Sequence, residues 1–280
     1  MLYLILGLFL GSFLNNVAYR LVKGEEFLFS RSKCPYCKKE LSWYELIPII
    51  SFIIQKGRCR NCKNKISLRY PLTEIIAGIF TYGAASKSDI LVNLNFSNLI
   101  LFLYIIFFYS ILFILALYDL ETFYIEEKTF YFGLLGWIIF TLIFLIIPIQ
   151  KFELTGGFNY FFNLPIKTKY SLILNQIFIA FIFSIFILTL FVVTLGKGIG
   201  LGDLKIAFFL GLFLGPGDIL AVILLSSFLG AIIGIYKILK IRKFFNEIPF
   251  IPLVFASSLV LLFYGEYLFK ILNSFMLKLS

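Results

Sequence analysis

The sequence predicts an all-α polytopic membrane protein. Of its 280 residues, 61% are hydrophobic and only 14% are charged, and the mean hydropathy is +0.98. Soluble domains contain about 45–50% apolar and about 25% charged residues, so a soluble fold has no place for this much apolar surface. The apolar residues also gather into long stretches, which is the pattern of helices that cross a bilayer.

Eight stretches approach the roughly 17–25 apolar residues that a membrane-spanning helix needs. They cover residues 2–19, 71–86, 98–118, 129–149, 171–195, 204–216, 218–236 and 249–271. The second and the sixth are short, so a tilted, buried or re-entrant helix is an alternative for each. The first lacks the basic leader and the cleavage site of a signal peptide, so we expect a retained helix. We divide the chain into this first helix (1–19), a loop domain (20–70) and a membrane-embedded domain (71–280).

The loop domain is strongly basic. It carries twelve Lys or Arg and four Glu, and so supplies +8 of the chain's net charge of +10. Basic residues accumulate in short cytoplasmic loops, and placing this loop inside puts 19 basic residues inside and 6 outside over eight crossings. The sequence therefore predicts a multi-pass protein of the cytoplasmic membrane with its N-terminus outside. Membrane lipids, rather than nucleic acid, are the expected partner of the basic loop.

All four cysteines of the chain lie in the loop domain as two CxxC pairs. Cys34 and Cys37 form the first pair, and Cys59 and Cys62 follow after 21 intervening residues. Two such pairs can hold one tetrahedral zinc ion with no open position, which predicts a structural site. Disulfides are not expected in the reducing cytoplasm; metal-free thiols or a redox pair are the alternative. The apolar run 46–54 is too short to span a membrane, and we expect it to pack under the metal site or to lie at the membrane surface.

Two aspartates that border apolar stretches are the candidate catalytic residues. Histidine is absent, which excludes Ser-His-Asp and Cys-His catalysis. Asp119 follows the apolar run 111–118, and Asp203 follows the glycine-rich segment 198–202. Ionisable groups bordering membrane segments suggest function, and two carboxylates that share a proton can act as general base and general acid. The alternative is that both aspartates cap helices or pair with Lys128 and Lys205.

Other protein classes fit parts of the sequence. An ion-coupled transporter would use intramembrane carboxylates as relays, but it predicts internal repeats and broken helices, and we find no convincing repeat. A non-catalytic scaffold would use the cysteine domain to hold a partner, but it leaves the segment at Asp203 without a role. Glu121, Glu126 and Glu127 also suggest a net acidic loop that attracts a basic peptide, with solvated helix ends as the alternative.

Several short motifs occur in order along nearly the whole chain. They are Gly11–Asn15 with Tyr19 and Arg20, the paired cysteines with Leu46–Pro48 and Gly57–Arg60, Ile66–Leu72 with Glu74, Asp119 with Leu120, Gly200–Asp203 with Lys205, and Ile248–Phe250 with Pro252. Together they resemble the type IV prepilin peptidases, which are bifunctional leader peptidases and N-methyltransferases of bacterial inner membranes. The departures are Glu121 and Glu126-Glu127, where the family often has Asp and Pro-Asp, and Ile251, where Gly is usual.

The resemblance implies an intramembrane aspartic protease whose catalytic pair is Asp119 and Asp203. It implies cleavage, on the cytoplasmic side, of the short basic leader of prepilins or pseudopilins of type IV pili or type II secretion. It also implies N-methylation of the new N-terminus with S-adenosylmethionine as methyl donor, an activity of members that carry the tetracysteine domain. The sequence shows no methyl-donor signature of its own, so the methyltransferase activity rests on the resemblance.

Overall fold

The computed structural model describes residues 1–25, 31–146, 169–196, 200–241 and 248–279, and these residues are mostly helical. The long helices are α1 (Leu2–Lys23), α3 (Arg69–Lys87), α4 (Phe96–Thr122), α5 (Glu127–Ile146), α7 (Lys169–Val193), α8 (Leu201–Phe213), α9 (Pro216–Ile241) and α10 (Ile251–Leu279). Two short elements, η1 (Trp43–Leu46) and α2 (Ile50–Ile54), belong to the loop domain. Within the described ranges there are two isolated β-bridges and no strand, so the all-α prediction is confirmed.

Six of the described helices are long and apolar enough to cross a membrane: α1, α4, α5, α7, α9 and α10. The other two long helices, α3 and α8, match the two stretches that the sequence marks as short. With 13 residues, α8 is about 20 Å long and falls short of the hydrocarbon core of about 30 Å. Pro216 then begins α9, where its missing N–H costs nothing because the first turn has no intrahelical acceptor. The predicted span 129–149 ends outside the described residues.

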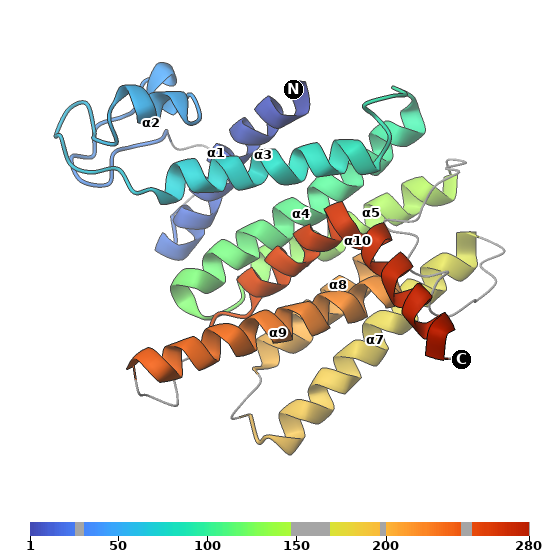
Figure 1. Ribbon diagram of the computed structural model, residues 1–280. Helices are drawn as coiled ribbons and strands as arrows, with labels where there is room; N and C mark the ends of the chain where they lie inside the picture. The colour runs from blue at the N-terminus through green and yellow to red at the C-terminus, as the bar shows by residue number, and fades with distance from the viewer. Residues whose placement is uncertain (26–30, 147–168, 197–199, 242–247, 280) are drawn as a thin grey trace.

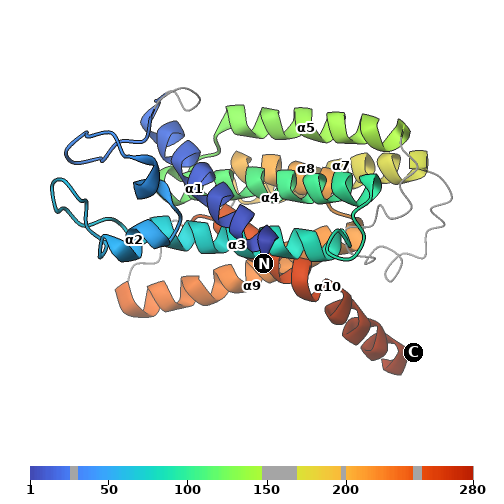
Figure 2. The same cartoon turned by 90° about the horizontal axis from the view of Figure 1, so that it is seen from above.

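The helices run roughly along one direction, and α4 lies in the middle of the bundle (Figures 1 and 2). It is the most buried candidate span, with 72% of its most apolar window buried. On one flank α1 packs closely on α3. A Cβ atom added to Gly7 would lie only 2.6 Å from the carbonyl oxygen of Ala77, so the glycine permits a close helix crossing of the kind that small residues allow in membranes.

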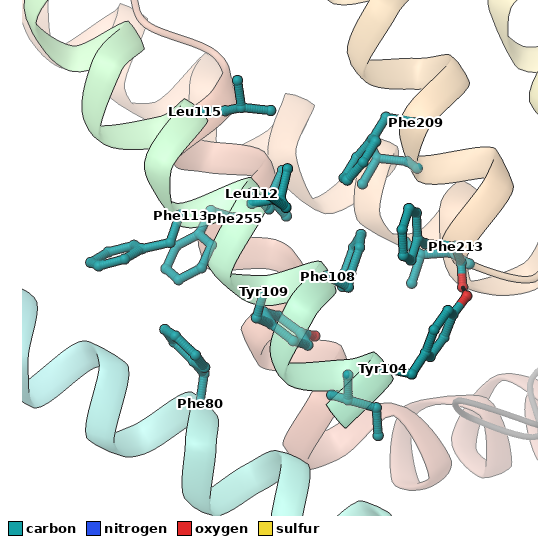
Figure 3. Close-up of a cluster of buried hydrophobic side chains, with 14 of the residues drawn as sticks. Phe80, Tyr104, Phe108, Tyr109, Leu112, Phe113, Leu115, Phe209, Phe213 and Phe255 are labelled. Carbon is teal, nitrogen blue, oxygen red and sulfur yellow. Dashed lines mark hydrogen bonds between the residues drawn. The ribbon is translucent and has the colours of Figure 1, made fainter. Parts of the chain in front are cut away.

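Aromatic side chains on α4 hold the neighbouring helices in place (Figure 3). The ring of Phe108 stacks on Phe213 of α8 with centroids 5.0 Å apart. The ring of Phe113 lies 5.0 Å from that of Phe255 on α10. Such pairs contribute about 0.5–1.5 kcal/mol each beyond their burial. They fix α8 and α10 against α4, and the candidate site is built at one end of these three helices.

The apolar run 46–54 forms the end of η1, a turn and α2, and much of it is exposed. Ile53 and Ile54 in particular have most of their surface uncovered. The expectation that this run packs under the metal site is therefore wrong for these residues, because the five residues of α2 turn one side away from the domain. The alternative expectation, a position at the membrane surface, remains.

Candidate active site and metal centre

Asp119 lies in the last turn of α4, inside the helix and not after its end as the predicted stretch 98–118 implies. Phe108, Leu112, Leu115 and Asp119 recur at helical spacing and so share one face. The three apolar residues are fully buried, and Asp119 is only 6% exposed. The apolar pattern of α4 therefore ends in a buried carboxylate.

Asp203 lies in the first turn of α8, whereas the predicted stretch begins one residue after it. Its Oδ2 atom accepts a hydrogen bond from the backbone N–H of Gly200, 3.0 Å away. This contact satisfies a donor that the helix start would otherwise leave unpaired, so α8 begins before the aspartate. Asp203 does cap its helix, as one alternative predicts; Gly198 and Ile199 of the glycine-rich segment lie outside the described residues.

The alternative ion pairs of the two aspartates are not found. Within the described ranges, neither Asp119 nor Asp203 forms a salt bridge with Lys128 or Lys205. Instead, the Nζ atom of Lys205 lies 2.6 Å from Oε1 of Glu127. That pair joins the N-terminal part of α8 to the first turn of α5, so it fixes the position of the segment that carries Asp203.

The ends of three helices meet at the aspartates. Asp203 lies close enough to Asp119 for the two carboxylates to interact electrostatically. The backbone N–H of Ile251, the first residue of α10, donates to Oδ2 of Asp119 over 3.0 Å. Each aspartate thus has one oxygen held by a backbone N–H at the start of a helix, where the helix dipole favours negative charge. The second oxygen of each carboxylate is not used in these contacts.

Arg69 and Glu121 form an ion pair that links the loop domain to this site. Arg69 lies at the end of the loop domain and begins α3, and Glu121 follows Asp119 by two residues. Both side chains are less than one-third exposed, so solvent screens the pair only in part. The pair places the paired cysteines and the aspartates at the same end of the bundle.

The three glutamates near Asp119 are engaged in holding helix ends. Glu121 pairs with Arg69, and Glu127 pairs with Lys205. Glu126 accepts a hydrogen bond from the backbone N–H of Thr129 and so caps the start of α5. These contacts favour the helix-end alternative over an acidic loop that attracts a peptide.

The four cysteines come together as one cluster. Their sulfur atoms all lie within 4.8 Å of one another, and none is in a disulfide. Each pair sits in the same kind of turn: the N–H of Cys34 donates to Lys39 O, and that of Cys59 donates to Asn64 O. A tetrahedral ion about 2.3 Å from each sulfur needs sulfurs roughly 3.8 Å apart, and the Cys34 and Cys62 sulfurs are 3.9 Å apart. The cluster therefore fits a single metal ion.

The environments of the thiols differ. Hydrogen bonds from the backbone N–H of Lys39 and from the side chain of Asn61 lower the pKa of Cys37 to about 6. Burial raises the pKa of Cys34 to about 11. A metal ion binds thiolates and displaces these protons, so the Cys37 thiol is already prepared for binding and the buried Cys34 thiol depends on the ion to lose its proton.

Some contacts at the site were not predicted from the sequence. The sequence marks Ile251 only as a departure from a motif, yet its backbone N–H binds Asp119. A backbone donor leaves no trace in residue identity, because any residue except proline supplies it. Arg69 and Glu121 are 52 positions apart, beyond the range of any helical spacing rule.

Comparison with known proteins matches two regions of the chain to family models. Residues 5–87 match the family described as Bacterial Peptidase A24 N-terminal domain, and residues 106–235 match the Type IV leader peptidase family. No solved structure gives a significant match.

Several relatives match along most of their length. A Bacillus subtilis (strain 168) protein named prepilin leader peptidase/N-methyltransferase is 29% identical over 94% of this chain and 93% of its own. A protein of the same name from Burkholderia pseudomallei (strain 1026b) is 27% identical over 96% of this chain and 87% of its own. One from Myxococcus xanthus (strain DK1622) is 41% identical over a shorter region, 30% of this chain and 25% of its own. The chain therefore belongs to the type IV leader peptidase family.

Proposed function

We propose that this protein is an aspartic endopeptidase that removes the short basic leader of prepilins or pseudopilins, with Asp119 and Asp203 as its catalytic pair. The names of its relatives support the reaction. The observation that carries the choice of residues is that two aspartates, from the end of α4 and the start of α8, lie within range of electrostatic interaction, and that each has one oxygen held by a backbone N–H. Histidine is absent from the chain and all four cysteines lie together in a cluster that could hold a metal ion, so neither His-dependent nor Cys-dependent hydrolysis competes with the aspartate pair.

The proposed chemistry uses one proton shared by the two carboxylates. The ionised aspartate takes a proton from a water molecule as the water oxygen attacks the scissile carbonyl carbon, and the protonated aspartate gives its proton to the carbonyl oxygen. The tetrahedral intermediate then returns a proton to one carboxylate, and its C–N bond breaks as the leaving nitrogen is protonated by the other. No acyl-enzyme forms. The held oxygens keep both carboxylates oriented throughout, which is the positioning that catalysis needs.

The fold supports a lateral approach of the substrate. A leader peptide followed by an apolar helix can keep the helix in lipid while the leader lies at the bundle end that carries the aspartates. We propose that this end is cytoplasmic, because the basic loop domain lies there and basic loops stay inside. The ion pair of Arg69 with Glu121 supports this placement, since it joins the loop domain to the end of α4.

We propose that the protein also methylates the new N-terminus, as the N-methyltransferase names of the relatives indicate for those proteins. S-adenosylmethionine would supply the methyl group. The described residues contain no strand-and-helix nucleotide fold, so we assign no residue to the methyl donor. The metal at Cys34, Cys37, Cys59 and Cys62 is proposed to be zinc in a structural role, because four thiolates leave no position for a substrate.

The test is processing of a prepilin peptide by purified protein in lipid. Asp119→Asn and Asp203→Asn should each lower cleavage by at least about a thousandfold, because either change removes the base or the acid. Asp89→Asn is the matched control at the opposite end of α3, where asparagine suits the observed positive φ of 56°. Equal thermal unfolding of all variants would show that the losses are chemical. Substantial cleavage by either active-site variant would refute the assignment, and ion flux into vesicles without any cleavage would favour the transporter.

A further inference from the structure

We infer that the edge of the loop domain formed by residues 43–54, here called the η1–α2 edge, inserts into the head-group layer of an anionic bilayer. The inference goes beyond the proposed function and does not rest on it. It follows from four features of the described residues: exposure, an anchor to α3, a fixed turn and charge.

Large apolar side chains on the η1–α2 edge are exposed. Trp43 is 78% exposed, Ile53 66% and Ile54 75%. Tyr44, Leu46 and Ile50 add further exposed apolar surface. Proteins rarely leave a contiguous set of this kind in water, and tryptophan beside aliphatic residues is typical of the membrane interface.

A buried carboxylate in the second turn of α3 anchors the η1–α2 edge to that helix. The N–H of Ile49 donates to Oε2 of Glu74 over 2.7 Å. Glu74 lies five residues after Arg69, the start of α3, which is about 7.5 Å along the helix axis. At this level the outward face of α3 exposes Leu72 and Ile75, the side chains expected against lipid. The edge is therefore attached at a depth where lipid already begins.

The turn before α2 fixes the direction of the edge. Ile49 has φ 60° and ψ −49°, and the N–H of Ile50 donates to the carbonyl of Pro48, which is a γ-turn with a β-branched residue at its centre. Such a conformation is strained and persists only where its surroundings hold it. The hydrogen bond from Ile49 N–H to Glu74 provides this constraint. The edge thus has one orientation relative to α3.

The charge of the domain selects the partner. Residues 31–68 contain nine Lys or Arg and two Glu, a net charge of +7. Four thiolates with one divalent ion would add −2 and leave +5. An apolar edge on a basic domain complements anionic head groups over an apolar interior. The same charge repels a basic leader peptide and a second copy of this domain.

The position of α2 in the molecule agrees with lipid as the occupant. Figure 1 shows α2 beside the starting end of α3, at the border of the helix bundle and not over its centre. A bilayer that surrounds the bundle comes up to this border, so the edge reaches lipid without any movement of the helices.

The chain offers a direct test because it has two tryptophans, Trp43 and Trp137. Trp137 lies in α5 and is buried in the bundle. In the Trp137→Phe protein all tryptophan fluorescence comes from the η1–α2 edge. The full chain is placed in nanodiscs containing phosphatidylglycerol, and its emission is measured with phospholipids brominated at shallow or deep acyl carbons and with aqueous iodide. The Trp43→Phe protein, which reports from Trp137, is the reference for the bundle interior.

Insertion predicts that shallow bromines quench Trp43 at least twofold more than deep bromines and that iodide quenches it less than half as well as it quenches free tryptophan. Ile53→Asp with Ile54→Asp should reduce the bromine quenching by more than half, while Leu94→Asp, at an exposed position in the connection between α3 and α4, should not. Folding of the loop domain is checked in each variant by alkylation of the four cysteines. In a folded domain, added metal should protect all four thiols from alkylation. Full access of iodide without bromine quenching would refute the inference, and protection from both quenchers would also refute it by showing that protein covers the edge.

Discussion

The backbone N–H of Ile251 donates to the Oδ2 atom of Asp119 across 132 positions of sequence, at 3.0 Å. This contact joins the first residue of α10 to the last turn of α4. The donor is a main-chain group, so the isoleucine side chain takes no part in the contact. The start of α10 therefore helps to position Asp119 of the proposed catalytic pair.

Replacing this donor should impair catalysis more than folding. Ile251→Pro removes the N–H but suits the first position of a helix. A hydrogen bond to a charged group contributes about 1.5–3 kcal/mol, so kcat should fall by roughly 10–100-fold. The measurement is cleavage of a prepilin peptide at saturating substrate. Ile251→Val keeps the N–H and should stay near wild type, and an unchanged kcat for the proline variant would remove α10 from the site.

The pair of Lys205 with Glu127 should act on catalysis through the position of Asp203. Its partly exposed geometry limits its contribution to stability to less than about 1 kcal/mol. Lys205→Gln is expected to lower kcat by roughly three- to tenfold with a smaller change in KM, because α8 loses its link to α5. The exchange variant, Lys205→Glu with Glu127→Lys, should recover most of the loss. Failure of the exchange together with a normal kcat for Lys205→Gln would show that the pair is only a surface contact.

The pair of Arg69 with Glu121 should contribute to stability. Nε and Nη2 of Arg69 are buried and have no hydrogen-bond partner among the described residues, so loss of Glu121 leaves the guanidinium without compensation. We expect Glu121→Gln to lower the free energy of unfolding by about 1–2 kcal/mol. The double change with Arg69→Gln should cost less than the sum of the single changes, by about 1 kcal/mol. Additive effects in denaturant unfolding would contradict the coupling.

The thiols should react in a fixed order with pH once the metal is removed. Thiolate is the reactive form, so alkylation of Cys37 should rise as the pH passes about 6, whereas Cys34 should stay protonated until the pH approaches about 11. Iodoacetamide labelling followed by mass spectrometry measures each site. Asn61→Ala removes a donor 3.6 Å from the Cys37 sulfur and should move its midpoint upward. Bound zinc should protect all four cysteines, and equal reactivity of the four in metal-free protein would be inconsistent with these environments.

Close packing of α1 on α3 should make Gly11 intolerant of a side chain. An added Cβ would lie 2.7 Å from Glu74 Cα and from the carbonyl oxygen of Thr73. We expect Gly11→Ala to destabilise the protein by about 1–2 kcal/mol, since the overpacking cost exceeds the gain in helix propensity. Gly234→Ala in α9 is the control, because among the described residues its Cβ would meet only Ile248 Cδ1, at 3.6 Å. The measurement is the thermal unfolding temperature of the two variants and the wild type in micelles. An unchanged unfolding temperature for Gly11→Ala would mean that α1 and α3 can move apart without a loss of stability.

Much of the fold was predictable because its signals are local. Each apolar stretch must satisfy its own backbone hydrogen bonds in lipid, so length and hydropathy are enough to place a helix. The predicted helix ends were less accurate, as at α8, because the capping contact of Asp203 with Gly200 adds a turn that hydropathy does not show. The cysteine pairs were predictable for a similar reason, since both ligands of each pair lie within four residues.

The sequence by itself determined the membrane class, the helices, the metal-ligand set and the two aspartates as candidates, because each depends on composition or on spacing within a few residues. Only the tertiary structure decided that Asp119 meets the start of α10, that Arg69 reaches Glu121 and that Lys205 chooses Glu127 over the nearby aspartate. Those contacts join residues 52 to 132 positions apart. They depend on how whole helices pack around the aromatic side chains of α4, and no local pattern in the chain records that packing.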